Sequence, residues 1–325
     1  MSLSNKPISG HEPGSLCPLC NSNGEFSFRS RDLFFKGTLI YQYMQCTHCG
    51  AVYQDPMPTQ AEIEGFYPDD YSVYRKIRPP KRHGRAKFAV LRYKYGYKHL
   101  HVPRAFLLMA SVLSLFRYRD SITYVPNGRA LDIGCGNGKF IQAMNSLGWQ
   151  FEGVEFNPVA VDACHEAGLK VFHGELQAAA YKDNSFDLIT ARHVIEHMPN
   201  PNNFMCEITR ILKKKGRLVI ETPNSQALGR RWFGTNWYAN EVPRHLVLYN
   251  TDNLNSLAER HGMRRIKVKT PTTPKIILNS LDYLIGRKDK PSRKSKFLRL
   301  LSRPYVMLAA ITGRGDIVLA TYERS

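Results

Sequence analysis

The chain has 325 residues, of which 43% are hydrophobic and 22% are charged, a balance typical of a folded globular protein and not of a disordered or fibrous one. Its longest uncharged apolar run, from Ala105 to Phe116, is too short to cross a bilayer. The first residues, MSLSNKPISGHEPGS, lack the apolar stretch of a secretory signal, so we expect a cytoplasmic protein.

The formal net charge of +19 is concentrated in two stretches. Residues 71–120 hold 13 Lys or Arg and one acid, and residues 260–304 hold 14 and two acids, so the rest of the chain is net negative. A solvated basic face over ordinary helix packing is the first interpretation of these stretches. Both stretches also contain apolar runs, so the next interpretation is peripheral contact with an anionic membrane surface, on the inner face of the membrane. Nucleic acid is disfavoured as a partner because binding RNA does not require the apolar runs.

Four of the seven cysteines form two C-x-x-C pairs. Cys17 and Cys20 are followed, after a 25-residue spacer, by Cys46 and Cys49. Each pair can direct two sulfurs at one ion from a tight turn, and two such turns complete a tetrahedral shell for zinc. Because four thiolates leave no open position, we expect a structural zinc without catalytic chemistry, in a zinc ribbon over residues 1–60.

The predicted elements follow in chain order. The ribbon holds strand-like runs at 25–30 and 38–46, and residues 61–122 are predicted to form a basic helical linker. From there on, short apolar runs alternate with helical patterns, with strands at 129–134, 150–156, 170–174, 185–191, 216–222, 265–270 and 316–323 and helices at 138–148, 157–168 and 202–214. This alternation predicts an α/β, doubly wound Rossmann-like sheet in a domain over residues 123–325, with an inserted basic helical segment at about 271–312.

The first strand of this sheet ends in LDIGCGNGKF. Gly134, Gly136 and Gly138 allow the backbone to approach a ligand closely, and the following helix presents its N-terminus to a negative group. Glu155 ends the second strand, where a carboxylate can accept both ribose hydroxyls. The G-x-G-x-x-G fingerprint of dinucleotide sites would need glycine at Lys139, so the pattern departs from it.

LDIGCGNG, with Asp132 before its glycines, resembles the first motif of class I S-adenosylmethionine-dependent methyltransferases. GVEFNP resembles their second motif, DNSFDLITARHVIEHMPNP their fourth-strand motif, and EITRILKKKGRLVIETPN the helix and strand that follow. The resemblance covers about residues 127–270. With the four-cysteine N-terminus, the chain is similar to zinc-containing methyltransferases of sugar and polysaccharide biosynthesis. This implies S-adenosyl-L-methionine as cofactor and a glycan-type or other small-molecule acceptor, carried on a lipid or a nucleotide.

The resemblance also implies the residues that hold the cofactor. Those around its methionine and ribose parts would be Asp132, Gly134, Gly136 and Gly138. Glu155 would hold the ribose hydroxyls, and Phe156 would flank the adenine. The adenine end would also be lined by Glu175 and Leu176, while Arg192 and His193 would lie beside the methyl group.

Residues 191–201, ARHVIEHMPNP, contain H-x-x-E-H, the zinc signature of one group of metalloproteases. Such a site needs a helix, so that its two histidines share one face. Here an apolar strand runs almost to His193, and Pro199 and Pro201 follow His197 closely. We therefore interpret the motif as a strand-end loop over a cofactor pocket and expect Glu196 and His197 to pair with neighbours.

Methyl transfer to oxygen or carbon needs a base, and a histidine suits that task. RHLVLY resembles the His- and Tyr-bearing loop of sugar methyltransferases, which makes His245 the first candidate, with Tyr249 beside it and His193 as the second candidate. The Tyr-x-Glu-His order of the sugar C-methyltransferases is absent, so the accepting atom stays open. An RNA methyltransferase and a non-catalytic cofactor-binding adaptor are the alternative functions.

Overall fold

The computed structural model describes residues 14–67, 84–116, 121–286 and 296–325. Parts of both predicted basic stretches, residues 71–83, 117–120 and 287–295, lie outside the described residues. The chain divides into two compact units. Unit 1 comprises Met1–Asp69, Ala191–Thr209 and Leu218–Ser325, and unit 2 comprises Asp70–Thr190 and Arg210–Arg217. Residues predicted as the zinc ribbon therefore share a unit with a large part of the predicted methyltransferase domain.

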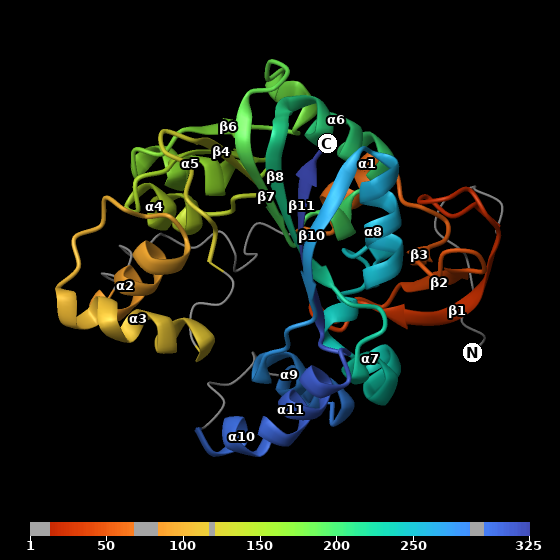
Figure 1. Cartoon of the computed structure of the whole chain (residues 1–325). Helices are drawn as coiled ribbons and strands as arrows, with labels where there is room; N and C mark the ends of the chain where they lie inside the picture. The colour runs from red at the N-terminus through yellow and green to blue at the C-terminus, as the bar shows by residue number, and fades with distance from the viewer. Residues whose placement is uncertain (1–13, 68–83, 117–120, 287–295) are drawn as a thin grey trace, which may run out of the picture. The chain divides into compact units, whose positions relative to one another are not determined.

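Unit 1 contains a four-stranded antiparallel sheet (Figure 1). Its strands, in spatial order, are β1 (Gly24–Arg31), β2 (Ile40–Cys46), β3 (Val52–Gln54) and β9 (Val247–Leu248). β1 and β2 confirm the two strand-like runs of the predicted ribbon. β9 was not predicted: it comes from the RHLVLY stretch and pairs with β3 through Val52–Leu248 and Tyr53–Val247. The loop that carries the candidate base His245 thus supplies the last strand of the N-terminal sheet, although it lies far away in the sequence.

A seven-stranded sheet forms the core of the fold, and it confirms the predicted Rossmann-like class with a central, mostly parallel sheet. Its order is β10 (Met263–Lys269), β11 (Ile317–Arg324), β8 (Leu212–Pro223), β7 (Phe186–Arg192), β4 (Arg129–Ile133), β5 (Gln150–Glu155) and β6 (Val171–His173). β4, β5 and β6 are parallel, whereas β10 and β11 pair antiparallel. The order reverses at β4, which has β5 on one side and β7 on the other.

Local sequence signals explain several boundaries. In α5 (Pro158–Glu166), the Asn157 side chain caps the first turn by accepting from Ala160 N at 3.1 Å, and proline takes the first helical position as predicted. α4 (Lys139–Asn145) starts after Gly138. The helix predicted for 202–214 was too long: α6 (Pro201–Ile211) ends at Ile211, and Leu212 already belongs to β8.

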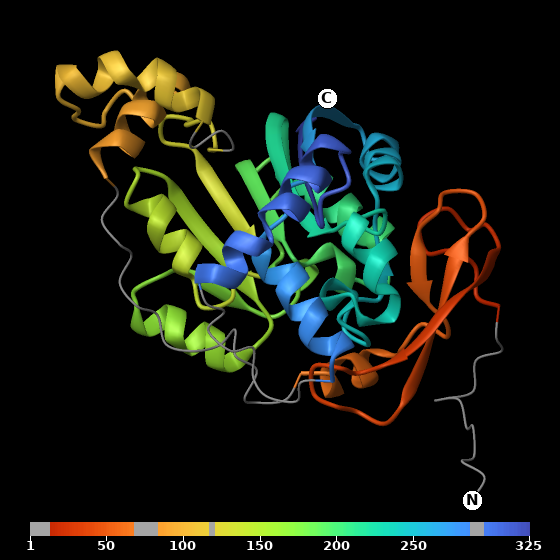
Figure 2. The ribbon, with the colours of Figure 1, turned by 90° about the horizontal axis from the view of Figure 1, so that it is seen from below.

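The remaining helices belong to one unit or the other. In unit 2, α2 (Arg85–Lys94) and α3 (Arg104–Phe116) lie side by side (Figures 1 and 2). Unit 1 holds α1 (Gln60–Gly65), α7 (Leu228–Phe233), α8 (Thr251–Arg260), α9 (Pro274–Leu284), α10 (Lys296–Leu301) and α11 (Arg303–Ile311). It also holds α6 up to Thr209, whereas Arg210 and Ile211 belong to unit 2. Short 3₁₀ turns are η2 (Gln177–Ala179), η3 (Ile195–His197), η4 (Gly234–Asn236) and η5 (Tyr238–Asn240). Within the described ranges, no helix is both long and apolar enough to span a membrane.

Candidate active site

The loop after β4 is built from glycines in a left-handed backbone conformation. Gly134, Gly136 and Gly138 have φ angles of 62°, 53° and 71°. A Cβ at Gly138 would lie 2.4 Å from Leu169 Cδ1 and 2.8 Å from Cys164 Sγ. Both the backbone angle and the packing therefore require glycine at this position. The tight turn leads directly into α4, as the sequence pattern predicts.

Glu155, the last residue of β5, has a side chain oriented by backbone amides in unit 2. It is 4% exposed; its Oε2 accepts from Gly136 N at 2.8 Å and its Oε1 from Asn157 N at 3.0 Å. Burial raises the pKa of this carboxyl, and the amide hydrogen bonds oppose that rise. Asp132 is also buried and accepts from Thr190 Oγ1 at 2.5 Å. The structure thus joins the glycine loop to Glu155 by a hydrogen bond.

The other predicted cofactor contacts of unit 2 lie nearby in sequence. Phe156 follows Glu155 and is 45% exposed, Glu175 is exposed, and Leu176 is buried. A strand-end carboxylate with fixed oxygens, followed by an exposed aromatic ring, fits the ribose hydroxyls and the adenine of an adenosyl cofactor. The residues present are therefore compatible with S-adenosylmethionine.

The H-x-x-E-H motif lies in a strand-end loop, which confirms the sequence interpretation: His193 follows β7, and η3 supplies a single turn. His193 has a φ of 55°, unusual for a residue with a side chain, and its backbone N donates to Glu221 O at 2.7 Å. Its Nδ1 lies 3.2 Å from Glu196 Oε1 and its Nε2 3.6 Å from Glu221 Oε1. Half of the His193 side chain is exposed, so it is held in a strained but accessible position.

Glu196 is the buried partner of His193. It is fully buried and accepts from Thr222 Oγ1 at 2.8 Å. Burial favours protonation, but hydrogen bonding and charge from His193 lower the Glu196 pKa to about 2, so it is a carboxylate. In return, burial lowers the pKa of His193, while Glu196 and Glu221 outweigh burial and raise it to about 10. His193 is therefore an imidazolium at neutral pH in the free protein.

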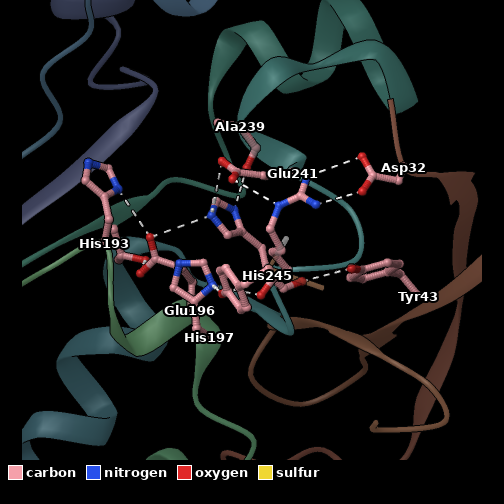
Figure 3. Close-up of polar contacts among 11 residues, drawn as sticks. Asp32, Tyr43, His193, Glu196, His197, Ala239, Glu241 and His245 are labelled. Carbon is pink, nitrogen blue, oxygen red and sulfur yellow. Dashed lines mark hydrogen bonds and ion pairs between the residues drawn. The ribbon is translucent and has the colours of Figure 1, made fainter. Parts of the chain in front are cut away.

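His245 is buried, and Figure 3 shows its ring pointing toward Ala239, Glu241 and Glu196. Its Nδ1 is 2.9 Å from the carbonyl oxygen of Ala239, and since a carbonyl only accepts, Nδ1 carries the proton. Its Nε2 lies 3.7 Å from Glu241 Oε2 and 4.0 Å from Glu196 Oε1. Burial lowers the His245 pKa to about 4, with Glu241 opposing, so the ring is neutral at pH 7. Glu196 is thus flanked by a charged and a neutral histidine.

Of the three catalytic candidates, only His193 reaches the surface. Tyr249 is fully buried, and its hydroxyl donates to Ile195 O at 3.3 Å, which places it under the η3 turn. Arg192, the last residue of β7, is half-buried, and its charge lowers the pKa of Glu221. His193, Glu196, His245 and Tyr249 are therefore joined in one network within unit 1.

The N-terminal sheet supports this network through residues that sequence reasoning missed. Arg244, 1% exposed, places Nη1 2.7 Å from Asp32 Oδ2 and Nε 3.2 Å from Glu241 Oε1 (Figure 3). The Tyr43 hydroxyl donates to the carbonyl of His245 at 2.8 Å. These partners are far apart in the sequence, so no local pattern connects them. The sequence offered two hints: Asp32 in the turn after β1, and Arg244 directly before the candidate base His245.

The four predicted metal ligands meet at one point. The Sγ atoms of Cys17, Cys20, Cys46 and Cys49 lie within 4.8 Å of one another, with Cys17–Cys49 at 3.7 Å and Cys20–Cys46 at 3.5 Å. Zn–S bonds of roughly 2.3 Å place tetrahedral sulfurs roughly 3.8 Å apart, whereas a disulfide needs about 2.05 Å. The cluster fits a tetrahedral zinc ion, and Gly50 adopts the predicted left-handed conformation at φ 69°.

A second group with metal-ligand chemistry occurs among the described residues. Glu196, His197 and His245 offer atoms within 4.8 Å of one another. One ring nitrogen of each histidine is already engaged, since His197 Nδ1 is 2.8 Å from both Tyr67 Oη and Arg244 O, and His245 Nδ1 binds Ala239 O. The expected pairing of Glu196 and His197 with neighbours is confirmed, and we interpret the group as a hydrogen-bonded network and not as a metal centre.

Comparisons with known proteins agree with this geometry. Residues 117–268 match the family model described as "Methyltransferase domain". The chain is 30% identical over 112 residues to the ubiquinone biosynthesis O-methyltransferase of Burkholderia thailandensis, covering 32% of this chain and 48% of that protein. The mitochondrial enzyme of the same name from Schizosaccharomyces pombe is 29% identical over 125 residues, 36% and 44% of the two chains. The chain spans about half the length of the curated relatives it matches.

Among solved structures, a SAM-dependent methyltransferase from Archaeoglobus fulgidus aligns with a TM-score of 0.46 and 21% identity, covering 68% of this chain and all of that one. The sheet itself defines an α/β protein of the Rossmann-like class. Within that class, residues 117–268 are similar to methyltransferase domains.

Proposed function

We propose that the chain transfers a methyl group from S-adenosylmethionine to an oxygen or carbon of a glycan-type or other small-molecule acceptor. The observation that carries the proposal is the Glu155 carboxylate at the end of β5, oriented by Gly136 N and Asn157 N beside the left-handed glycine loop. Asp132, Glu155 and Phe156 would hold the cofactor. When bound, the cofactor supplies an electrophilic methyl group on a sulfonium.

The chain's own contribution would be positioning and proton transfer. His193 is the accessible histidine of the network, and we assign its neutral form, which predominates only above its pKa of about 10, the role of base that takes the acceptor's proton. Glu196 and Glu221 stabilise the resulting imidazolium, because both carboxylates raise the His193 pKa. His245 and Tyr249, being buried, act as positioning residues that fix Glu196 and the η3 turn.

Two considerations support the acceptor class. The similarity to sugar and polysaccharide methyltransferases favours a glycan-type acceptor. The curated relatives are named O-methyltransferases, which favours oxygen over carbon as the accepting atom. An RNA methyltransferase remains the second candidate because of the net charge of +19, and a non-catalytic adaptor is disfavoured by the intact glycine loop and Glu155.

We also propose that the four-cysteine cluster holds a structural zinc. The surrounding residues of unit 1 hold the turns in place: Arg260 donates to Leu19 O at 2.7 Å, and Asn253 donates to Cys49 O at 3.3 Å. Because β3 then pairs with β9, close to His245 in sequence, the zinc would stabilise the part of unit 1 that holds the catalytic network.

A peripheral membrane contact is supported by α9, α10 and α11. These helices, which lie close together in unit 1 (Figure 1), carry large exposed apolar side chains: Leu281, Leu284, Phe297, Leu298, Leu300, Leu301, Met307, Leu308 and Ile311. Lys275, Arg299 and Arg303 add positive charge on the same helices. Apolar and basic side chains together favour an anionic lipid surface, which would place a cytoplasmic enzyme on the inner face of a membrane.

The proposed function is tested by a transfer assay. Purified protein receives radiolabelled S-adenosylmethionine and a cell extract separated into RNA, soluble metabolites and membrane lipid-glycan. We expect label in the sugar-nucleotide or lipid-glycan fraction. Label in RNA alone would contradict the proposal, and absence of both transfer and cofactor binding would favour the adaptor.

A further inference from the structure

Unit 1 contains a cavity of about 570 Å³ that none of the predicted site residues lines. Its wall comes from β1, the turn before α7, α7 itself, the η4–η5 segment and the loop after α11. The lining residues are Ser27, Phe28, Ser225, Gln226, Ala227, Arg230, Arg231, Gly234, Thr235, Asn240 and Arg314. The volume is in the range of small-molecule sites.

The charged residues of this wall are all positive. It holds three arginines and no acidic residue. Arg230 is the least exposed of the three: its Nη1 donates to Ser225 O at 3.2 Å, and its guanidinium lies 5.5 Å from the centre of the Phe28 ring. Burial alone lowers its pKa. The Ser225 carbonyl and the Phe28 ring carry no negative charge, so they do not neutralise the guanidinium. The positive charge of Arg230 therefore lacks the carboxylate partner that a buried arginine usually has.

Arg244, in the same unit, shows the contrast. It is buried as well, but Asp32 and Glu241 both lie within 3.2 Å of its guanidinium. Arg244 is therefore a structural arginine, and the carboxylates that would make Arg230, Arg231 and Arg314 structural are absent from the cavity wall. Arginine clusters of this kind recognise phosphate and carboxylate groups through their fixed fork of N–H donors.

We propose that this cavity binds the phosphate ester of a sugar, with the phosphate on Arg230, Arg231 and Arg314. That the ester carries a sugar and is the methyl acceptor rests on the proposed function; the binding of its phosphate does not. Asn240 lies between Ala239, whose carbonyl holds His245, and Glu241, so the occupied cavity adjoins the segment that fixes the catalytic network. The phosphate can come from a nucleotide or a lipid carrier, since both present the same ester chemistry.

The test is calorimetric binding of inorganic pyrophosphate, glucose 1-phosphate and glucose to the full chain, with S-adenosylmethionine binding measured on the same samples. We expect the two phosphates to bind and glucose not to bind. Arg231→Gln and Arg314→Gln, both at exposed positions, should weaken both phosphates by roughly tenfold or more each. Arg265→Gln, an exposed arginine on β10, is the matched control and should leave binding unchanged.

UDP-glucose and a polyprenyl diphosphate sugar in detergent then distinguish the carriers; tighter binding of either one identifies the source. Pyrophosphate binding that survives the combined Arg231→Gln and Arg314→Gln change would overturn the inference, as would absence of phosphate binding in a protein that binds the cofactor. Absence of cofactor binding with phosphate binding intact would instead refute the proposed function alone.

Discussion

Asp32, in the turn after β1, forms a two-point ion pair with Arg244, with Nη1–Oδ2 at 2.7 Å and Nη2–Oδ1 at 3.3 Å. The arginine also lies over the rings of Phe34 and Phe35 at 5.4 Å and 5.0 Å. Its neighbour in the sequence is His245. The N-terminal sheet thus fixes the backbone of the loop that holds the buried histidine, which gives this sheet a role in positioning the proposed catalytic network.

Breaking this pair should destabilise unit 1. Asp32→Asn leaves the Arg244 guanidinium buried with only Glu241 as a charged partner, and we expect a loss of about 3–5 kcal/mol in the free energy of unfolding. Denaturant titration measures it. Asp183→Asn, which breaks the surface pair between Asp183 and Arg210, is the control and should cost about 0–1 kcal/mol. Equal effects of the two changes would contradict a structural role for the buried pair.

Metal analysis should find zinc bound by the four-cysteine cluster. Cys17→Ser should remove the zinc and lower the melting temperature, because the sulfurs of the two knuckles would no longer share an ion. Elemental analysis and thermal unfolding measure both effects. Cys206→Ser, at an exposed cysteine outside the cluster, should keep the zinc. If zinc persists in Cys17→Ser but is lost in His197→Gln, the metal is bound by the group of Glu196, His197 and His245 and not by the four cysteines.

Glu155→Gln should weaken S-adenosylmethionine binding by at least roughly tenfold, since an amide cannot accept two ribose hydroxyls while also accepting Gly136 N and Asn157 N. Isothermal titration calorimetry gives the dissociation constant. Glu166→Gln makes the same chemical change at an exposed position on α5 and should bind the cofactor like the original chain. If both variants bind equally well, Glu155 is not a cofactor ligand.

Methyl transfer should increase with pH. A base must be unprotonated to accept a proton, and Glu196 and Glu221 raise the His193 pKa to about 10, so kcat/KM should rise through that region. Glu221→Gln removes one of the two carboxylates, so the His193 pKa falls and the profile should move to lower pH. As a control, Glu166→Gln, at an exposed position on α5, should leave the profile in place. An unshifted profile in Glu221→Gln would exclude His193 as the titrating group.

The stability of the protein should fall in mild acid because of His245. Its pKa is lowered to about 4 in the folded state, so between pH 6.5 and 4 the unfolded chain binds a proton that the folded chain does not. The free energy of unfolding should therefore decrease as the pH drops through this window. His245→Gln should show a shallower decrease when denaturant midpoints are compared at pH 7 and pH 5. A decrease of unchanged slope would assign the effect to other groups.

Local sequence patterns were enough to predict several strands, turns and helix starts of this protein. The strand at 129–134, its left-handed glycines and the capped helix after Asn157 were predictable because backbone angles, caps and apolar periodicity act over a few residues. The C-x-x-C spacing likewise identified the four cysteines that meet in the structure. The loop interpretation of H-x-x-E-H followed from the strand before it and the prolines after it.

Only the tertiary structure decided which side chains of that pattern are accessible and what they contact. Sequence similarity ranked His245 above His193, yet burial and the Ala239 carbonyl make His245 an interior group, while His193 keeps half its side chain exposed. The ion pair between Asp32 and Arg244 joins residues far apart in the chain, and the arginine-lined cavity is likewise built from distant segments. Such contacts depend on how sheets and loops pack, and packing is set by long-range burial that no window of a few residues contains.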